Sequence, residues 1–211
     1  NSLTALDLNN NVYLVILEIA DNQLTEIDLS ANISLEVFYA FENQFTQLDL
    51  ANQPLLKKLW ISDNQLTSLD ISKNIIMETL NRNNNLLGSL DISTNTVLSV
   101  LSSTSNNLTS LNLLNGNNDA ITTMTVTNNP NLTCIQIDEG FTPPNTWAKD
   151  ATGNYSTDCS VTTSINKALS ASFDVYPNPV NHTLYIENIH NSIEIIKLDI
   201  YDLQGRLVSS S

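Results

Sequence analysis

Hydrophobic positions recur every 21 residues from residue 1 to residue 131. The unit is clearest at 56–76, LKKLWISDNQLTSLDISKNII, where Leu56, Leu59, Ile61 and Leu66 are apolar and Asn64 stands between them. Three columns of matching residues run through the chain at this spacing: Leu14, Leu35, Leu56, Met77 and Leu98; Asn22, Asn43, Asn64, Asn85 and Asn106; Leu3, Leu24, Phe45, Leu66, Leu87 and Leu108. Self-similarity at one period over six units predicts a solenoid of stacked turns.

Each turn is expected to contain two short extended segments. Successive side chains of a strand face opposite sides, so in the first segment Leu59 and Ile61 should point inward and Trp60 outward. In the second segment, 66–71, Leu69 should point inward and Asp70 outward. No stretch between them shows the 3.6-residue period of an amphipathic helix. The sequence therefore predicts a solenoid of short β-strands and turns with few or no helices.

The asparagine column has a structural interpretation. A buried Asn amide can donate and accept hydrogen bonds at once, so it can satisfy backbone groups where the chain turns. We therefore expect one buried amide in every turn, with a structural role.

A second polar column lies on the outside of the second segment and consists of Asp7, Asp28, Asp49, Asp70 and Asp91, followed by Asn112. Stacking at the strand spacing of about 4.8 Å would let these like charges raise each other's pKa or attract a cation. Calcium, which prefers oxygen ligands, is one candidate at the edge Asp28, Asp49, Asp70 and Asp91. We favour the alternative, in which each Asp accepts hydrogen bonds from nearby Ser, Thr or backbone N–H groups, because one carboxylate per turn falls short of the six to eight oxygens that calcium takes. No cofactor is expected.

Aromatic residues gather on the outward stripe of the first segment, which reads Glu18, Tyr39, Trp60, Asn81 and Ser102. Tyr39 and Trp60 are 21 residues apart and should be stacked neighbours, with Phe41 two positions further along the strand of Tyr39. Grouped exposed aromatics typically mark a contact surface. The candidate ligand-binding residues are Tyr39, Phe41 and Trp60 with the neighbouring acids Glu18, Glu42 and Asp63. The alternative is that the rings pack beneath a preceding segment outside this sequence.

The repeat register shifts after Leu113. A step of 21 from Asn106 reaches Thr127, and the asparagine column resumes at Asn129, two residues late. The insertion is the loop 115–118, NGNN, which consists of turn-forming residues.

The segment 132–159 is predicted to be a cap on the solenoid. A last strand at 132–137 leads into an irregular stretch that contains Pro143, Pro144 and Trp147. Cys134 and Cys159 are the only cysteines, and we expect a disulfide that ties a covering segment across the end of the core, worth about 3 kcal/mol in the chain-entropy model. Such a bond implies an oxidising compartment, whereas two buried free thiols would fit a cytosolic protein.

Composition narrows the classes of partner. The net charge is −14, from 22 acidic and 8 basic residues, and such a surface repels phosphate backbones, so no nucleic acid partner is expected. No apolar run approaches the roughly 20 residues of a membrane helix, so no transmembrane segment is expected. The sequence begins inside a repeat at Asn1, so further turns are expected before it.

The C-terminal part follows a different pattern. Residues 160–172 are rich in Ser, Thr and Ala without a strong period, which predicts a linker. The segment 173–180, FDVYPNPV, is a strand stopped by two prolines, and 183–186 alternates. Residues 193–208 predict a hairpin about 202–206, in which Gly205 suits a left-handed turn position. These elements would begin a small β-sandwich.

Two resemblances to known families indicate a function for the two parts of the chain. The motifs YPNPV at 176–180, LYIEN at 184–188 and IYDLQGRLV at 200–208 resemble the type A sorting domain of the type IX secretion system of Bacteroidetes. The motif residues are Tyr176, Pro177, Asn178, Pro179 and Gly205. The family normally continues for further strands, so the resemblance implies a partial, Ig-like sorting domain over 173–211.

The repeats, with the pattern L-x-x-L-x-L-x-x-N-x-L, resemble the 21-residue leucine-rich repeats of secreted proteins from the same bacteria. In that family a segment like NPNLTCIQID, at 129–138 here, closes the array together with a later cysteine. The resemblance implies export by the type IX machinery and surface attachment or release from a Gram-negative cell, often with removal of the tail.

The principal functional hypothesis is a secreted or cell-surface recognition or adhesion module that binds a protein or glycan through its strand face. One alternative is a solenoid enzyme acting on polysaccharide, with Asp49 and Asp70 as acid and base. No enzymatic activity is expected, because the carboxylates form a uniform row and both histidines, His182 and His190, lie in the tail away from every repeat serine and from Cys134. A passive spacer is the other alternative.

Overall fold

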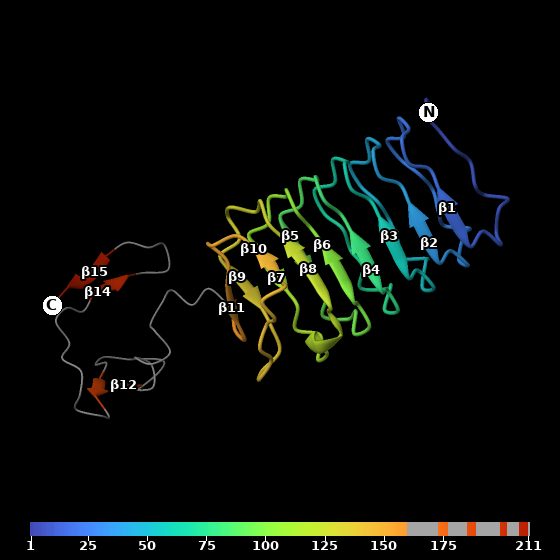
Figure 1. Ribbon diagram of the computed structural model, residues 1–211. Helices are drawn as coiled ribbons and strands as arrows, with labels where there is room; N and C mark the ends of the chain where they lie inside the picture. Colours follow the sequence, from blue (N-terminus) through green and yellow to red (C-terminus); the bar gives the residue numbers. More distant parts are fainter. Residues whose placement is uncertain (160–172, 177–184, 189–198, 202–206, 211) are drawn as a thin grey trace. The chain divides into compact units, whose positions relative to one another are not determined.

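The computed structural model divides into two compact units, 1–159 and 160–211. The structure describes residues 1–159 and, in the second unit, only the strand segments 173–176, 185–188, 199–201 and 207–210. The first unit is a solenoid whose turns follow one another from the N-terminal end to the cap (Figure 1).

One side of the solenoid is a parallel sheet of seven strands, which confirms the first predicted segment. Its members, in order, are β1 (Ile16–Glu18), β2 (Val37–Tyr39), β3 (Lys58–Trp60), β4 (Thr79–Asn81), β6 (Val100–Ser102), β8 (Thr123–Val126) and β10 (Ala148–Lys149). The first five strands pair in a register of 21 residues, so that Phe38 lies beside Leu59 and Leu59 beside Leu80. These central side chains are fully buried, whereas Trp60 points outward, as the alternation predicted.

Helical structure in residues 1–159 is limited to the 3₁₀ turn η1 (Asn118–Ala120). None of the helices in the described part of the chain is long and apolar enough to cross a membrane.

The predicted asparagine column is a ladder of buried amides, and Asn64 shows its bonding. Its Oδ1 accepts a hydrogen bond from the N–H of Phe45 at 3.0 Å. Its Nδ2 donates to the carbonyl oxygens of Ala40, Ile61 and Ser62 at 3.0, 3.3 and 3.0 Å. Each amide thus links its own turn to the one before. The same arrangement recurs at Asn43, Asn85, Asn106 and Asn129.

Replacing Asn64 with Ala is expected to lower the free energy of unfolding by about 2 kcal/mol, because it leaves buried backbone groups without partners. Urea denaturation followed by circular dichroism measures the change. The exposed Asn52 is the matched control, and Asn52→Ala should change stability by less than about 0.5 kcal/mol. Equal stability of the two variants would contradict a bonding role for the column.

A second ladder of buried amides was not predicted. Asn32, Gln53, Asn74 and Asn95 are spaced 21 residues apart and are at most 1% exposed. Each donates from its side-chain nitrogen to carbonyl oxygens of the preceding turn, as Asn74 does to Leu50 at 3.1 Å and to Gln53 at 2.8 Å. The column was visible in the sequence at the same period as the first one.

The second predicted segment forms a sheet in the turns near the cap, and in the early turns it is not paired as strands. The sheet consists of β5 (Ser89–Asp91), β7 (Ser110–Asn112), β9 (Cys134–Gln136) and β11 (Asn154–Ser156). Residues 5–7, 26–28, 47–49 and 68–70 are not strands.

The inward leucine of the second segment is more deeply buried in the turns whose second segments form this sheet. Leu90 and Leu111, which lie in the ladder, are 3% and 1% exposed. Leu6, Ile27, Leu48 and Leu69 occupy the equivalent positions in the early turns and are only partly buried. Leu69 therefore packs against the core as predicted, but it and its equivalents are more exposed than the leucines of the paired strands.

The register shift is confirmed. Leu101 pairs with Met124, a separation of 23 residues instead of 21, and Asn129 continues the amide ladder. The inserted loop continues into η1, where the backbone N–H groups of Gly116 and Asn118 bond to the carboxylate of Asp138 at 2.9 and 3.0 Å.

An irregular stretch contains Pro143, Pro144 and Trp147 as predicted, and the cap beyond it continues the solenoid. Strand β10 pairs with β8, and β11 pairs with β9, so the cap supplies one more strand to each sheet. The predicted disulfide between Cys134 and Cys159 is present. Trp147 is 5% exposed, and its Nε1 donates to the carbonyl oxygen of Ile121 at 3.0 Å, which closes the end of the core.

In the second unit, β12 (Phe173–Tyr176) pairs antiparallel with β13 (Tyr185–Asn188), and β14 (Asp199–Tyr201) pairs antiparallel with β15 (Leu207–Ser210). The linker at 160–172 and the motif residues Pro177, Asn178, Pro179 and Gly205 lie outside the described residues. The β-sandwich and the finer domain boundaries therefore stay predictions.

Candidate functional site

Tyr39, Phe41 and Trp60 form an aromatic patch on the outward face of the seven-stranded sheet. The ring centroids of Tyr39 and Trp60 are 4.8 Å apart and those of Phe41 and Trp60 are 6.5 Å apart, with tilted planes. Parallel pairing in register places Tyr39 beside Trp60, as the 21-residue spacing predicted. Trp60 is 39% exposed even with these neighbours, so the patch presents aromatic surface to solvent.

Carboxylates border the patch on two sides. Glu18 is exposed and lies in β1 directly beside Tyr39. Asp21, Glu42 and Asp63 form a column in the turns after the strands, where each residue has a left-handed backbone with φ of 56°, 55° and 55°. The structure thus brings together the aromatic residues and the acids named from the sequence.

Glu42 is affected by its acidic neighbours. A side-chain hydrogen bond with Asp21 and the negative charge of Asp21 raise the pKa of Glu42, and burial and Asp63 add to the shift. Like charges held this close favour a ligand that carries positive charge or hydrogen-bond donors.

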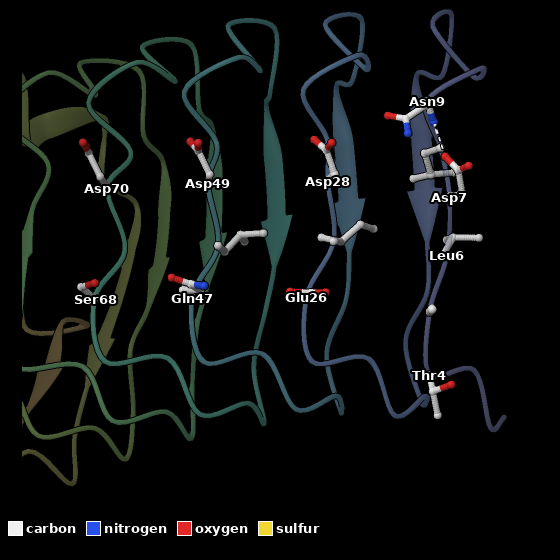
Figure 2. Close-up of a pocket in the computed structure, with 14 residues that line it drawn as sticks. Thr4, Leu6, Asp7, Asn9, Glu26, Asp28, Gln47, Asp49, Ser68 and Asp70 are labelled. Atoms are coloured by element: carbon white, nitrogen blue, oxygen red, sulfur yellow. Dashed lines mark hydrogen bonds between the residues drawn. The ribbon is translucent and has the colours of Figure 1, made fainter.

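A second surface feature, which we call the acidic groove, lies over the second segments of turns one to four. Its volume is about 800 Å³. Figure 2 shows that Asp7, Asp28, Asp49 and Asp70 project from successive turns in one row, with Glu26, Gln47 and Ser68 in a parallel row. The partly buried Leu6, Ile27 and Leu48 lie between these rows and form the apolar part of the lining.

Each aspartate of the groove has a backbone partner in its own turn. Oδ1 of Asp28 accepts from the N–H of Ser30 at 2.9 Å, and Oδ1 of Asp70 accepts from the N–H of Ser72 at 2.8 Å. Asp7, Asp49 and Asp91 make the same bond. Hydrogen bonds from the side chain and backbone of Ser30 lower the pKa of Asp28, and bonds from the backbone and side chain of Ser72 lower that of Asp70. Such bonds were expected in the favoured alternative to a calcium edge, in which each Asp accepts hydrogen bonds from nearby Ser, Thr or backbone N–H groups.

The members of the candidate calcium edge differ in their strand pairing. Asp28, Asp49 and Asp70 lie in segments that no ladder joins, and only Asp91 lies in a paired strand, where Asn112 Nδ2 donates to its Oδ1 at 3.1 Å. Among the residues that the structure describes, no group of three or more His, Cys, Asp or Glu side chains is placed to hold a metal ion.

The groove itself was not predicted, although its aspartates were. Its apolar lining consists of residues assigned to the core, and nothing in their types distinguishes Leu48 from the buried Leu90. The two leucines differ in that Leu90 lies in a paired strand and Leu48 does not.

Comparison with known proteins identifies the tail. Residues 174–211 match the family of secretion system C-terminal sorting domains, which confirms the prediction from the tail motifs. The sorting domain implies export by the type IX system, to the medium or to the outer-membrane surface. The type A subclass and the Bacteroidetes source stay predictions.

Among solved structures, the functional domain of InlJ from Listeria monocytogenes, a leucine-rich-repeat protein described as including a cysteine ladder, is similar, with a TM-score of 0.56 and 24% identity. The match covers 72% of this chain and 38% of that one, so this chain spans well under half of the length of its neighbour. At this identity the likeness shows the leucine-rich-repeat-like solenoid fold alone. No curated protein matches the chain.

Proposed function

We propose that this exported solenoid is a recognition or adhesion module that binds a protein or glycan ligand at the aromatic patch. The observation that carries the proposal is the contact of three aromatic rings on an outward sheet face, with Trp60 still 39% exposed. An exposed indole is costly in water, and aromatic side chains dominate the energetics of protein interfaces.

The surroundings of the patch support a binding role. The sheet backbone beneath it is paired on both sides, since β2 and β3 are internal strands, so the rings stand on a rigid base. Glu18, Glu42 and Asp63 supply hydrogen-bond acceptors at the rim, which suits either the donors of a protein or the hydroxyl groups of a sugar. We propose a binding role in preference to catalysis, because the outward aspartates repeat with the same local bonding and offer no distinct acid and base.

The double variant Tyr39→Ala/Trp60→Ala tests the proposal. Binding to immobilised extracellular-matrix proteins and to a glycan array is expected to weaken by about 30-fold or more, since removal of a central aromatic pair typically costs at least that much. The melting temperature should stay close to that of the wild type, because both side chains lie on the outward face of the sheet and the buried Phe38 and Leu59 remain in place.

Tyr13→Ala is the matched control, because Tyr13 is 88% exposed and lies outside the patch. It should leave binding unchanged. If the double variant retains wild-type affinity, the aromatic patch is not the binding surface. Absence of binding by the wild-type protein to every probe would favour the passive spacer.

A further inference from the structure

The acidic groove is a second surface of the solenoid, distinct from the aromatic patch. The patch stands on the seven-stranded sheet, whereas the groove lies over the second segments of the early turns. In these turns no ladder joins the second segments. Backbone bonds cross between turns at their first residues, as Gln44 N–H donates to the carbonyl oxygen of Leu24 at 2.8 Å, but residues 26–28 and 47–49 take no part in them. The groove therefore offers hydrogen-bonding backbone together with the partly exposed side chains of Ile27 and Leu48.

The charge of the groove is of one sign. Four aspartates and Glu26 line it, and its lining contains no Lys or Arg. Within residues 1–159 the one ion pair joins Lys57 to Glu36, and the cation that acts on the groove is Lys73, outside its lining, whose charge helps to lower the pKa of Asp70. The backbone bonds of the aspartates use Oδ1, and the hydroxyl groups of Ser30 and Ser72 also bond to the carboxylates of Asp28 and Asp70. In the turn of Asp49 the equivalent residue is Ala51, so Oδ2 of Asp49 is available for another donor.

The residues of the groove are arranged along one direction. Its acidic and aliphatic residues recur once per turn and lie in rows along the solenoid axis (Figure 2). A ligand that follows the rows must be extended and must carry repeated positive charges. Lysine and arginine match both parts of the lining, because their methylene stems pack on apolar surface while the charged heads reach the carboxylates.

We propose that the acidic groove binds an extended lysine- or arginine-rich segment of a partner protein. The segment lies across turns one to four, with its cationic heads against Asp28 and Asp49 and its stems over Ile27 and Leu48. A bound metal ion fits less well, since each turn offers one carboxylate and hard cations require several oxygens. The proposal does not depend on the aromatic patch.

The test measures binding of a fluorescein-labelled lysine decamer to the full chain by fluorescence anisotropy at low salt. Asp28→Asn/Asp49→Asn is expected to weaken binding about tenfold, because two close charge pairs are lost. The substitution keeps the local fold, as Asn112 occupies the same column and its Oδ1 accepts the equivalent bond from Leu114 N–H at 2.9 Å. Gln47→Lys, at an exposed position in the groove, should weaken binding by a similar factor.

The matched control separates a groove from general attraction to a chain of net charge −14. Asp119→Asn/Glu139→Gln removes the same two charges from exposed positions outside the groove and should weaken binding less than about twofold. Equal weakening by both double variants would overturn the proposal, as would an absence of binding to the wild type. Displacement of the peptide by about 1 mM calcium, with a rise in melting temperature, would assign the groove to a cation instead. Tyr39→Ala/Trp60→Ala should bind the decamer normally, so failure of the patch and failure of the groove are distinguishable.

Discussion

Replacement of Arg82 with Met is expected to raise the free energy of unfolding by about 2–4 kcal/mol. Arg82 is fully buried, and its Nη1 makes one long hydrogen bond, 3.5 Å, to the carbonyl oxygen of Ser89. Its Nε and Nη2 have no partner among the described residues, and no carboxylate pairs with it there. Preceding turns place the apolar Ile19, Ala40 and Ile61 at this position. Met fills much of the same space without a charge, and urea denaturation measures the gain.

The dependence of this gain on pH identifies its cause. Burial lowers the pKa of Arg82 to about 9. A base whose pKa is lower in the folded state destabilises the fold by a constant amount below that pKa, and the penalty shrinks as pH rises through it. The stability gap between Arg82→Met and the wild type should therefore be level from pH 7 to about pH 8 and should narrow above pH 9.

Lys73→Met is the matched control, because Lys73 is exposed and the substitution removes the same charge. It should change stability by less than about 0.5 kcal/mol. A loss of stability in Arg82→Met would contradict the expected gain, and it would mean that the guanidinium contributes a favourable interaction to the core.

The parts of the fold that follow from local pattern were predictable from the sequence. Burial of Leu59 and exposure of Trp60 are set by strand alternation, and the contact of Trp60 with Tyr39 is set by the 21-residue register. The amide ladder through Asn64 followed from the requirement that buried polar groups find partners. These features depend only on which residues recur at one period.

The turns in which the second segments pair as strands could not be predicted in this way. Leu69 and Leu90 are the same residue at equivalent positions, yet Leu90 lies in a ladder and is buried, while Leu69 is partly exposed. Ladder formation depends on the conformation and the distance of whole turns, which many residues set together. The acidic groove lies over turns that lack the ladder, and its position had no signal of its own in the sequence.

Strand β10 of the cap could not be predicted for another reason. Strand β10 has two residues and follows Pro143 and Pro144, so it lacks the alternation by which strands are identified. It pairs with β8 because the chain, tied at Cys134 and Cys159 and anchored by Trp147, returns to the end of the solenoid. Tertiary contacts outweigh local pattern in such a segment.

Removal of the disulfide is expected to destabilise the solenoid by about 3 kcal/mol, because the bond closes a loop that restricts the unfolded chain. The cysteines are 25 residues apart, and the loop between them contains both β10 and Trp147. Cys134→Ser/Cys159→Ser should therefore loosen the cap first. In that variant the exposed Trp60 can be replaced with Phe, so that tryptophan fluorescence during urea unfolding reports on Trp147 alone.

The cap contacts predict which signal changes earliest. Trp147 packs against Phe141 and Tyr155, with ring centroids 5.2 and 6.2 Å apart, and it covers the end of the core. Without the disulfide, exposure of Trp147 to solvent should precede the loss of the β-sheet circular dichroism signal, whereas in the oxidised protein the two should coincide. Reduction of the Trp60→Phe protein with dithiothreitol is the control and should reproduce the behaviour of the variant without the two cysteines. Coincident transitions and unchanged stability without the disulfide would mean that the strand pairing of β10 and β11 holds the cap by itself.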